Sequence, residues 1–161
     1  QVDVAAGGAD GFRADARGIV VNQALVALES GLTPCHTLVA LPEGVMLNYL
    51  LRRTSPTRFV TFMPPEVIAF GEDAMVADLS DHPPDCVALV HKDTTEYGMP
   101  RFGTDYGARI LAWVNERYTP IETFGALPLA GNRFAIQLLR RVAAPPPETV
   151  AWLNRATMLQ K

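Results

Sequence analysis

Two short apolar segments constrain the fold of this chain more than any other feature. "HTLVAL" (residues 36–41) and "CVALVH" (86–91) are rich in β-branched and aliphatic residues, and prolines stand close to both. Neither alternates between apolar and polar residues, as a half-exposed strand would, so both are typical of strands buried on two faces. Such strands need helices above and below the sheet, which indicates an α/β fold.

Helical periodicity fills most of the chain between and around these segments. Gly71 interrupts one of the helical patterns, and Thr104 is a plausible N-cap for another. Apolar residues recur at helical spacing in four segments, 16–30, 43–53, 66–81 and 105–116.

A third buried strand is predicted at 58–63, and a closing antiparallel hairpin at 118–125 and 133–141, because the connector between the last two is short. Strands separated by helices imply right-handed crossovers and a parallel sheet. We therefore expect an α/β, Rossmann-like three-layer sandwich, with a mainly parallel sheet and the antiparallel C-terminal hairpin at one edge.

The chain divides into three parts on composition. Residues 15–141 carry the α/β pattern, and residues 1–14, rich in Gly, Ala and Asp, are expected to be an irregular lead-in. Residues 142–161 begin with a Pro-rich spacer and continue as a short amphipathic helix that could dock on the body or on a partner. Because the chain starts at Gln1 without an initiator Met or a signal-peptide pattern, we expect a fragment of a longer protein.

Two cysteines, Cys35 and Cys86, each precede an apolar strand segment. If the two strands are neighbours, a disulfide is geometrically conceivable, since it needs Cα atoms about 4.4–6.8 Å apart. The interpretation favours free, half-buried thiols over a bridge. There is no C-x-x-C motif and no zinc-ligand spacing.

Candidate site residues follow from the rule that ligands bind beyond the carboxyl ends of parallel strands. The three predicted strands end in charged or polar residues, whereas their starting ends carry less charge. A solvated loop at each strand end is the alternative interpretation, because loop backbone groups must reach water. The ligand-binding candidates are Glu43, Glu66, His91, Lys92, Asp93, Thr94, Glu96 and Tyr97.

The sequence lacks the motifs and composition typical of several classes of function. The net charge of −3 argues against nucleic acid as a partner. The position of a dinucleotide-binding loop reads "PEGVML", with one glycine and a carboxylate where phosphate would lie, so no dinucleotide or other cofactor is expected. No G-x-S-x-G motif supplies a nucleophile, the three histidines do not cluster as metal ligands, and no apolar run reaches transmembrane length.

The phrases "LPEGVMLNYLLRR", "SPTRFVTFMPPE", "HPPDCVALVHKDTTEYG", "FGTDYG" and "FAIQLLRR" carry a resemblance over about residues 15–141. Together they resemble the soluble C-terminal domain of bacterial polytopic membrane glycosyltransferases of the protein-mannosyltransferase (family 39-like) type. In such proteins the catalytic acidic residue lies in a loop of the membrane-spanning part, which uses a polyprenyl-phosphate-linked sugar. The family's catalytic residues match no position of this sequence.

The resemblance implies a non-catalytic accessory domain on the extracytoplasmic (periplasmic) side of a bacterial inner membrane. Its expected partners are the transmembrane portion of the same polypeptide and a glycan or polyprenyl-phosphate sugar. The alternative from the residues alone is a free-standing Rossmann-like enzyme that acts on a small polar substrate. In that enzyme His91, beside Asp93 or Glu96, would do acid–base work.

Overall fold

The computed structural model of the chain describes residues 1–5, 10–30 and 35–142. The elements in chain order are β1 (Val2–Ala5), β2 (Gly11–Ala14), α1 (Arg17–Glu29), β3 (Leu38–Leu41), α2 (Val45–Leu51), α3 (Pro64–Phe70), α4 (Glu72–Asp81), β4 (Cys86–Val90), the 3₁₀ turn η1 (Thr95–Tyr97), α5 (Ala108–Arg117), β5 (Tyr118–Gly125) and β6 (Ala135–Arg141). All four predicted helical segments are confirmed, with Gly71 dividing α3 from α4.

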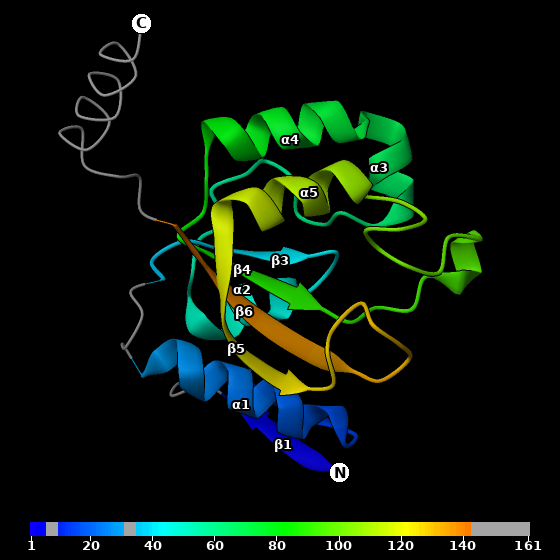
Figure 1. The fold of residues 1–161 in the computed structure, drawn as a ribbon. Coiled ribbons are helices and arrows are strands. Elements are labelled where there is room, and N and C mark those ends of the chain that lie inside the picture. Colours follow the sequence, from blue (N-terminus) through cyan, green and yellow to red (C-terminus); the bar gives the residue numbers. More distant parts are fainter. Residues whose placement is uncertain (6–9, 31–34, 143–161) are drawn as a thin grey trace, which may run out of the picture.

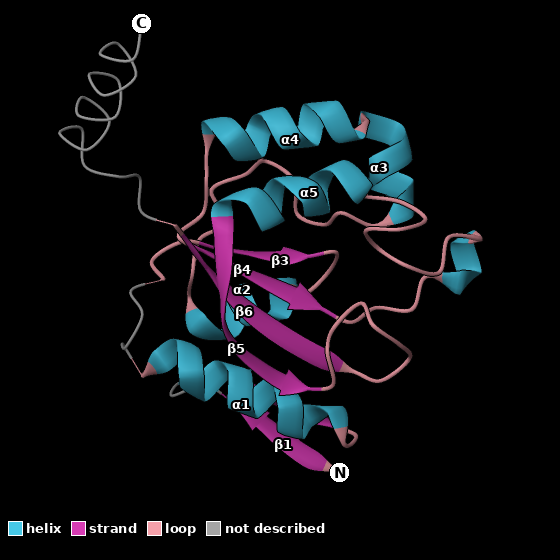
Figure 2. Ribbon diagram, in the orientation of Figure 1, coloured by secondary structure: helices cyan, strands magenta, loops and turns pink. Residues whose placement is uncertain are grey.

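The main sheet is mixed, with the strand order β3-β4-β6-β5 (Figure 2). Only β3 and β4 are parallel, whereas β6 runs antiparallel to both β4 and β5. The predicted Rossmann-like, mainly parallel three-layer sandwich is therefore wrong, and the fold is a small mixed α/β domain. The closing hairpin is confirmed, but β6 lies inside the sheet next to β4, so two of the three strand pairings are antiparallel.

The strand predicted at 58–63 does not form, which is why the sheet is less parallel than expected. In segment 58–63 the two aromatic residues, Phe59 and Phe62, are three positions apart, whereas strand residues on one face are two apart. Their rings pack on one another with centroids 6.1 Å apart. Asp78 of α4 holds the start of the segment by accepting hydrogen bonds from the Thr57 hydroxyl at 2.5 Å and the Arg58 backbone N–H at 3.1 Å. Packing on the helices thus replaces pairing in the sheet.

Helices cover both faces of the main sheet (Figure 1). Helices α3, α4 and α5 lie over one face, and α1 and α2 lie over the other. Successive strand residues point to opposite faces, so each strand contributes to two clusters. Toward α1 and α2 point Leu38, Ala40, Cys86, Ala88, Ile136 and Leu138; toward α3–α5 point Val39, Leu41, Val87, Leu89 and Leu139.

The predicted irregular lead-in instead contains a β-hairpin. Strands β1 and β2 pair antiparallel, with Val2 opposite Ala14. Val4 is fully buried in the cluster beneath α1, so the hairpin packs on the domain. The predicted amphipathic helix after the Pro-rich spacer lies outside the described residues.

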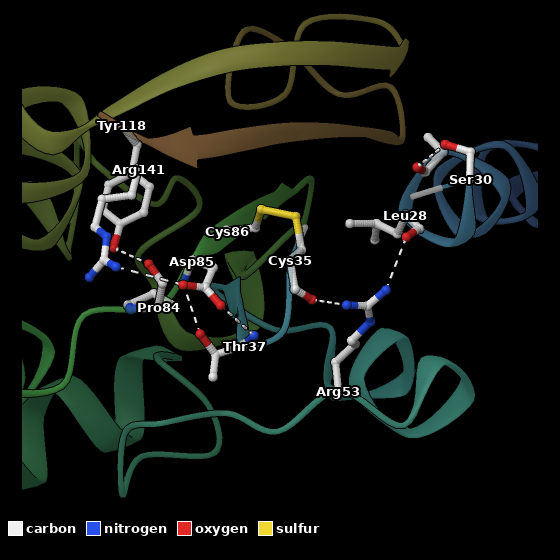
Figure 3. Close-up of a disulfide and its surroundings, with 11 residues drawn as sticks. Leu28, Ser30, Cys35, Thr37, Arg53, Pro84, Asp85, Cys86, Tyr118 and Arg141 are labelled. Carbon is white, nitrogen blue, oxygen red and sulfur yellow. Dashed lines mark hydrogen bonds and ion pairs between the residues drawn. A yellow bond between two sulfur atoms is a disulfide. The ribbon is translucent and has the colours of Figure 1, made fainter. Parts of the chain in front are cut away.

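The amino ends of β3 and β4 are cross-linked (Figure 3). Cys35 and Cys86 form a buried disulfide with their Cα atoms 5.4 Å apart, so the favoured prediction of free thiols is wrong. Beside it, the Thr37 N–H donates to the Asp85 carboxylate at 3.0 Å, and the Asp85 N–H donates to the Thr37 hydroxyl at 2.8 Å. Arg53 donates to the carbonyl of Cys35, which ties α2 to the same end of the sheet.

Helix α5 begins later than the sequence indicated and is capped from another helix. Its N-cap is Gly107 rather than Thr104, at a positive φ of 66°. The Glu72 carboxylate of α4 accepts hydrogen bonds from the backbone N–H groups of Gly107 at 3.0 Å and Arg109 at 2.7 Å. A carboxylate near a helix N-terminus satisfies otherwise unpaired donors and interacts favourably with the helix dipole.

Candidate functional site

The candidate site lies where β3 and β4 end and β6 begins. Because β3 and β4 are parallel, their carboxyl ends lie side by side, and the antiparallel β6 starts next to them. The His91 N–H donates to the carbonyl of Ala135 at 2.9 Å, which fixes the two chains together at this point. Here a cleft of about 620 Å³ is lined by residues that include Arg17, Glu43, Met46, His91, Lys92, Asp93, Asn132 and Phe134. We call it the polar cleft.

An ion pair joins the two parallel strand exits across the polar cleft. Lys92, after β4, lies 2.7 Å from the Glu43 carboxylate, after β3. The two side chains are 37% and 41% exposed, so water screens the attraction and its contribution to stability is small. Both groups therefore keep part of their surface toward solvent.

Asp93 forms a local turn with Thr95. Its Oδ1 atom accepts hydrogen bonds from the Thr95 N–H at 2.9 Å and the Thr95 hydroxyl at 2.5 Å. These hydrogen bonds hold the pKa of Asp93 below its usual value, and the nearby His91 also lowers it. Asp93 is therefore a carboxylate at neutral pH and accepts hydrogen bonds in the cleft.

His91 connects β4 to the loop between β5 and β6. Its Nε2 atom lies 3.0 Å from the carbonyl of Gly131. A carbonyl is only an acceptor, so this contact requires the proton on Nε2 and leaves Nδ1 as the acceptor of a neutral ring. The adjacent Asn132 contributes to the polar cleft from the same loop.

Arg17, Asn132 and Phe134 line the cleft but were not among the predicted candidates. Arg17 begins α1 and forms an ion pair with Asp15 at 2.9 Å, and its guanidinium lies 6.0 Å from the Phe134 ring centroid. Asn132 and Phe134 precede β6, which arrives at this end only because it runs antiparallel to β4. A mainly parallel sheet gives no reason to choose them, so the error in topology removed them from the prediction.

A second hollow of about 540 Å³ adjoins the polar cleft. The two share His91, Asp93 and Asn132, and the second adds Arg101 and the loop residues around Gly131. The shared side chains therefore stand between two depressions, so an extended ligand can contact them from both sides.

Gly44 lets the chain pass close beneath the polar cleft. A Cβ atom at this position would lie 2.8 Å from the Cβ of Ala40 and 3.1 Å from a methyl carbon of Val90. Both neighbours belong to the parallel strand pair, so neither can move without disturbing the sheet. The glycine keeps Glu43 close to the strand ends.

The structure separates the predicted candidates into two groups. Glu43, His91, Lys92 and Asp93 line the polar cleft, whereas the other four do not. Thr94 is fully buried and donates to the carbonyl of Met99 at 2.5 Å, so its role is structural. Glu96 and Tyr97 lie exposed in η1.

Glu66 lies in the first turn of α3, outside the cleft. Its Oε2 atom is buried and has no hydrogen-bond partner among the described residues. The strand that was expected to deliver it to the site is absent, because residues 58–63 pack on the helices instead.

The residues that line the cleft differ in chemical type from those of a nucleophile or metal site. No serine, threonine, cysteine or tyrosine is among the described residues that line it. Within the described parts of the chain, no group of three or more histidine, cysteine, aspartate or glutamate side chains could hold a metal ion. What the cleft does present is a set of mixed hydrogen-bond donors and acceptors around an aromatic side chain.

Comparison of the chain with models of protein families, with curated proteins and with solved structures found no significant match. Among residues 1–5, 10–30 and 35–142, no helix has the length and apolar character needed to cross a bilayer.

Proposed function

We propose that this chain is a non-catalytic accessory domain of a membrane-bound glycosyltransferase, and that it binds a glycan or the sugar of a lipid-linked donor in the polar cleft. The observation that carries the proposal is the make-up of the cleft: carboxylate, amide, imidazole, ammonium and guanidinium groups beside Phe134. The resemblance of residues 15–141 to the extracytoplasmic domain of such enzymes supplies the biological setting.

The chemistry of the cleft suits a sugar. Asp93 accepts hydrogen bonds, Lys92 and Arg17 donate them, and Asn132 does both, which matches hydroxyl groups that act as donor and acceptor. Phe134 adds an apolar surface on which the apolar face of a pyranose ring can lie. A few placed polar groups beside apolar surface are typical of small-ligand sites.

Independent catalysis is less well supported. A glycoside hydrolase needs one carboxylic acid with a raised pKa to protonate the leaving group. In the cleft, the pKa of Asp93 is lowered by Thr95, and Glu43 is paired with Lys92. Neither carboxyl group has the surroundings of a general acid, and no hydroxyl or thiol nucleophile is among the described lining residues.

The disulfide supports an extracytoplasmic location for the domain. Disulfides such as Cys35–Cys86 persist in oxidising compartments and are rare where thiol reductants are abundant. This agrees with a domain attached to the outer side of a bacterial inner membrane through the transmembrane portion of the same polypeptide.

The test is a titration of the full chain, uniformly labelled with ¹⁵N, followed by amide NMR. The probes are free hexoses, short oligosaccharides, and a short-chain polyprenyl phosphate without sugar. We expect saccharides to shift the amides of His91, Asp93 and Asn132, and the sugar-free phosphate to leave them unchanged.

Two variants make the titration specific. We expect Asp93→Ala to weaken saccharide binding at least about tenfold, which corresponds to about 1.4 kcal/mol. The matched control is Asp73→Ala, which removes the same charge from an exposed position on α4. Shifts that spare the cleft, or equal affinity in both variants, would refute the proposed site. Turnover of an activated sugar that is lost in His91→Ala would instead establish the alternative, a free-standing enzyme.

A further inference from the structure

A third hollow, this one mainly apolar, adjoins the polar cleft along helix α2. It has a volume of about 640 Å³, and its lining includes Asp10, Phe12, Val45, Met46, Tyr49 and Leu50. We call it the α2 groove. Val45 and Met46 also line the polar cleft, so the two hollows meet at the amino end of α2.

Three large side chains of the α2 groove expose much of their surface. Phe12, Val45 and Tyr49 are 41%, 48% and 56% exposed. Val45 and Tyr49 are four residues apart on α2 and therefore lie on the same helix face, whereas Phe12 comes from β2. Single exposed apolar side chains are common, but a group of them around one groove is typical of a contact surface.

An ion pair borders the groove at the carboxyl end of α2. Arg52, the C-cap residue of α2, pairs with the carboxylate of Asp10, and its guanidinium lies 4.4 Å from the Tyr49 ring centroid. The Asp10 carboxylate thus already has a partner. Among the described lining residues, only the Tyr49 hydroxyl then remains as an unpaired side-chain hydrogen-bonding group, so the groove offers a ligand mainly apolar contact.

This composition distinguishes between two ways of extending a sugar from the polar cleft. A second sugar unit in the α2 groove would place several hydroxyl groups beside apolar side chains, which costs free energy unless each finds a partner. An aliphatic chain needs no partners and gains affinity with each methylene group that leaves water. The groove therefore favours an aliphatic chain.

The length of α2 sets the path of such a chain. Its seven residues rise about 10 Å from the shared Val45 to the end of the helix, where Arg52 meets Asp10. We propose that the sugar ligand of the polar cleft carries an aliphatic chain, and that this chain lies along the α2 groove between Phe12 and Tyr49. This inference rests on the function proposed for the polar cleft.

The experiment compares ligands that share a sugar and differ only in the attached chain. The probes are the methyl and octyl glycosides of glucose and of mannose, used below the concentration at which the octyl compounds form micelles. They are titrated into the ¹⁵N-labelled full chain and followed by amide NMR. We expect the octyl compounds to bind at least about tenfold more tightly, a ratio that the burial of two methylene groups would produce. Both should shift the amide of Asp93, and only the octyl compounds those of Phe12 and Tyr49.

Matched variants test whether the groove is the source of this difference. Phe12→Ser should bring the octyl-to-methyl affinity ratio toward one, because it removes one wall of the groove. Tyr49→Ser, on a different element, should do the same and keeps the test valid if Phe12→Ser disturbs the β1–β2 hairpin. The control is Phe70→Ser, at a position on α3 that is 58% exposed, and it should leave the ratio unchanged.

The outcomes separate this inference from the function on which it rests. Equal affinity of methyl and octyl compounds at Asp93 would overturn the inference and leave the proposed function intact. Octyl compounds that shift the groove and spare Asp93 would show two unconnected sites and count against both. A disaccharide, maltose, that shifts the amides of Phe12 and Tyr49 would assign the groove to a second sugar unit instead. No shift with any of the four glycosides would also overturn the inference, whereas oligosaccharide binding in the polar cleft would still support the proposed function.

Discussion

The two ends of the parallel pair β3–β4 carry similar side chains and use them differently. At the amino end, the Asp85 carboxylate accepts a hydrogen bond from Thr37, which lies 48 residues away along the chain. At the carboxyl end, the Asp93 carboxylate accepts a hydrogen bond from Thr95, two residues away. The first aspartate–threonine pair holds two strands together, whereas the second shapes only its own turn.

The same contrast extends to the neighbours of the two aspartates. Asp85 lies beside the buried disulfide and is also 3.6 Å from Arg141, so cross-links converge on the amino end (Figure 3). At the carboxyl end the ionic contacts are exposed, and a cleft separates the elements that supply them. We infer that the amino end stabilises the fold and leaves the carboxyl end free to bind a ligand.

Removal of the Cys35–Cys86 disulfide should change the free energy of unfolding more than any other substitution considered below. It links positions 51 residues apart, and a cross-link of this span stabilises a domain by about 2–4 kcal/mol, chiefly by restricting the unfolded chain. We expect the double variant Cys35→Ala/Cys86→Ala to lose that much free energy of unfolding in denaturant titrations. The amide signals of His91 and Asn132, at the other end of the strands, should change little.

A reducing agent provides the control for this experiment. It should lower the unfolding midpoint of the parent chain and leave that of the double variant unchanged. A double variant as stable as its parent would show that the amino end does not depend on its cross-link.

The next largest loss of free energy of unfolding should follow the removal of Asp85, and not the removal of Asp93. Asp85→Ala removes the acceptor of the Thr37 N–H, and a hydrogen bond to a charged group contributes about 1.5–3 kcal/mol. We expect a loss of that size in the free energy of unfolding at neutral pH, and little change for Asp93→Ala, whose carboxylate is exposed. Equal losses in the two variants would contradict the division of roles.

The pH dependence of stability gives a second readout for Asp85. Partial burial raises the pKa of Asp85, but hydrogen bonds from Thr37 and the charge of Arg141 lower it by more, so the net shift is downward. A depressed folded-state pKa stabilises the protein above the unfolded pKa of about 3.9, and this stabilisation is lost as pH falls through the folded pKa. Asp85→Ala should therefore lose less stability than the parent between about pH 5 and pH 2, with Asp78 and Asp93 retaining their own contributions.

The smallest effect on stability should come from the ion pair of the polar cleft. Because Lys92 and Glu43 are more than one-third exposed, Lys92→Ala should change the free energy of unfolding by less than about 1 kcal/mol. The same variant should weaken saccharide binding measurably, because it removes a donor from the cleft. A variant that is clearly unstable yet binds normally would assign Lys92 to the scaffold instead.

The elements were largely predictable from the sequence because each depends on local patterns. Helical spacing identified α1 to α5, and the unbroken apolar runs identified β3 and β4. Segment 58–63 has the composition of a strand but does not form one. Phe59 and Phe62 instead bury their rings in the cluster formed with helices α3 to α5. The local sequence pattern does not show whether an apolar segment will pair in the sheet or pack against helices, because that depends on the tertiary contacts available to it.

The candidate site was predictable only where it depends on the parallel pair. Glu43, His91, Lys92 and Asp93 follow directly after β3 and β4, so their convergence depends only on those strands being parallel neighbours. Asn132 and Phe134 depend on β6 entering the sheet beside β4, and Thr94 turns inward rather than into the cleft. Neither fact has a local signal in the sequence.

The sequence by itself determined the helices, the buried strand pair and the charged residues that follow it, because periodicity and chain adjacency are local properties. Only the tertiary structure decided the direction and place of β6, the closure of the Cys35–Cys86 disulfide and the separation of structural from cleft-lining polar groups. Those outcomes depend on contacts between residues far apart in the chain, where hydrophobic packing and hydrogen-bond satisfaction select one arrangement among several that local sequence allows.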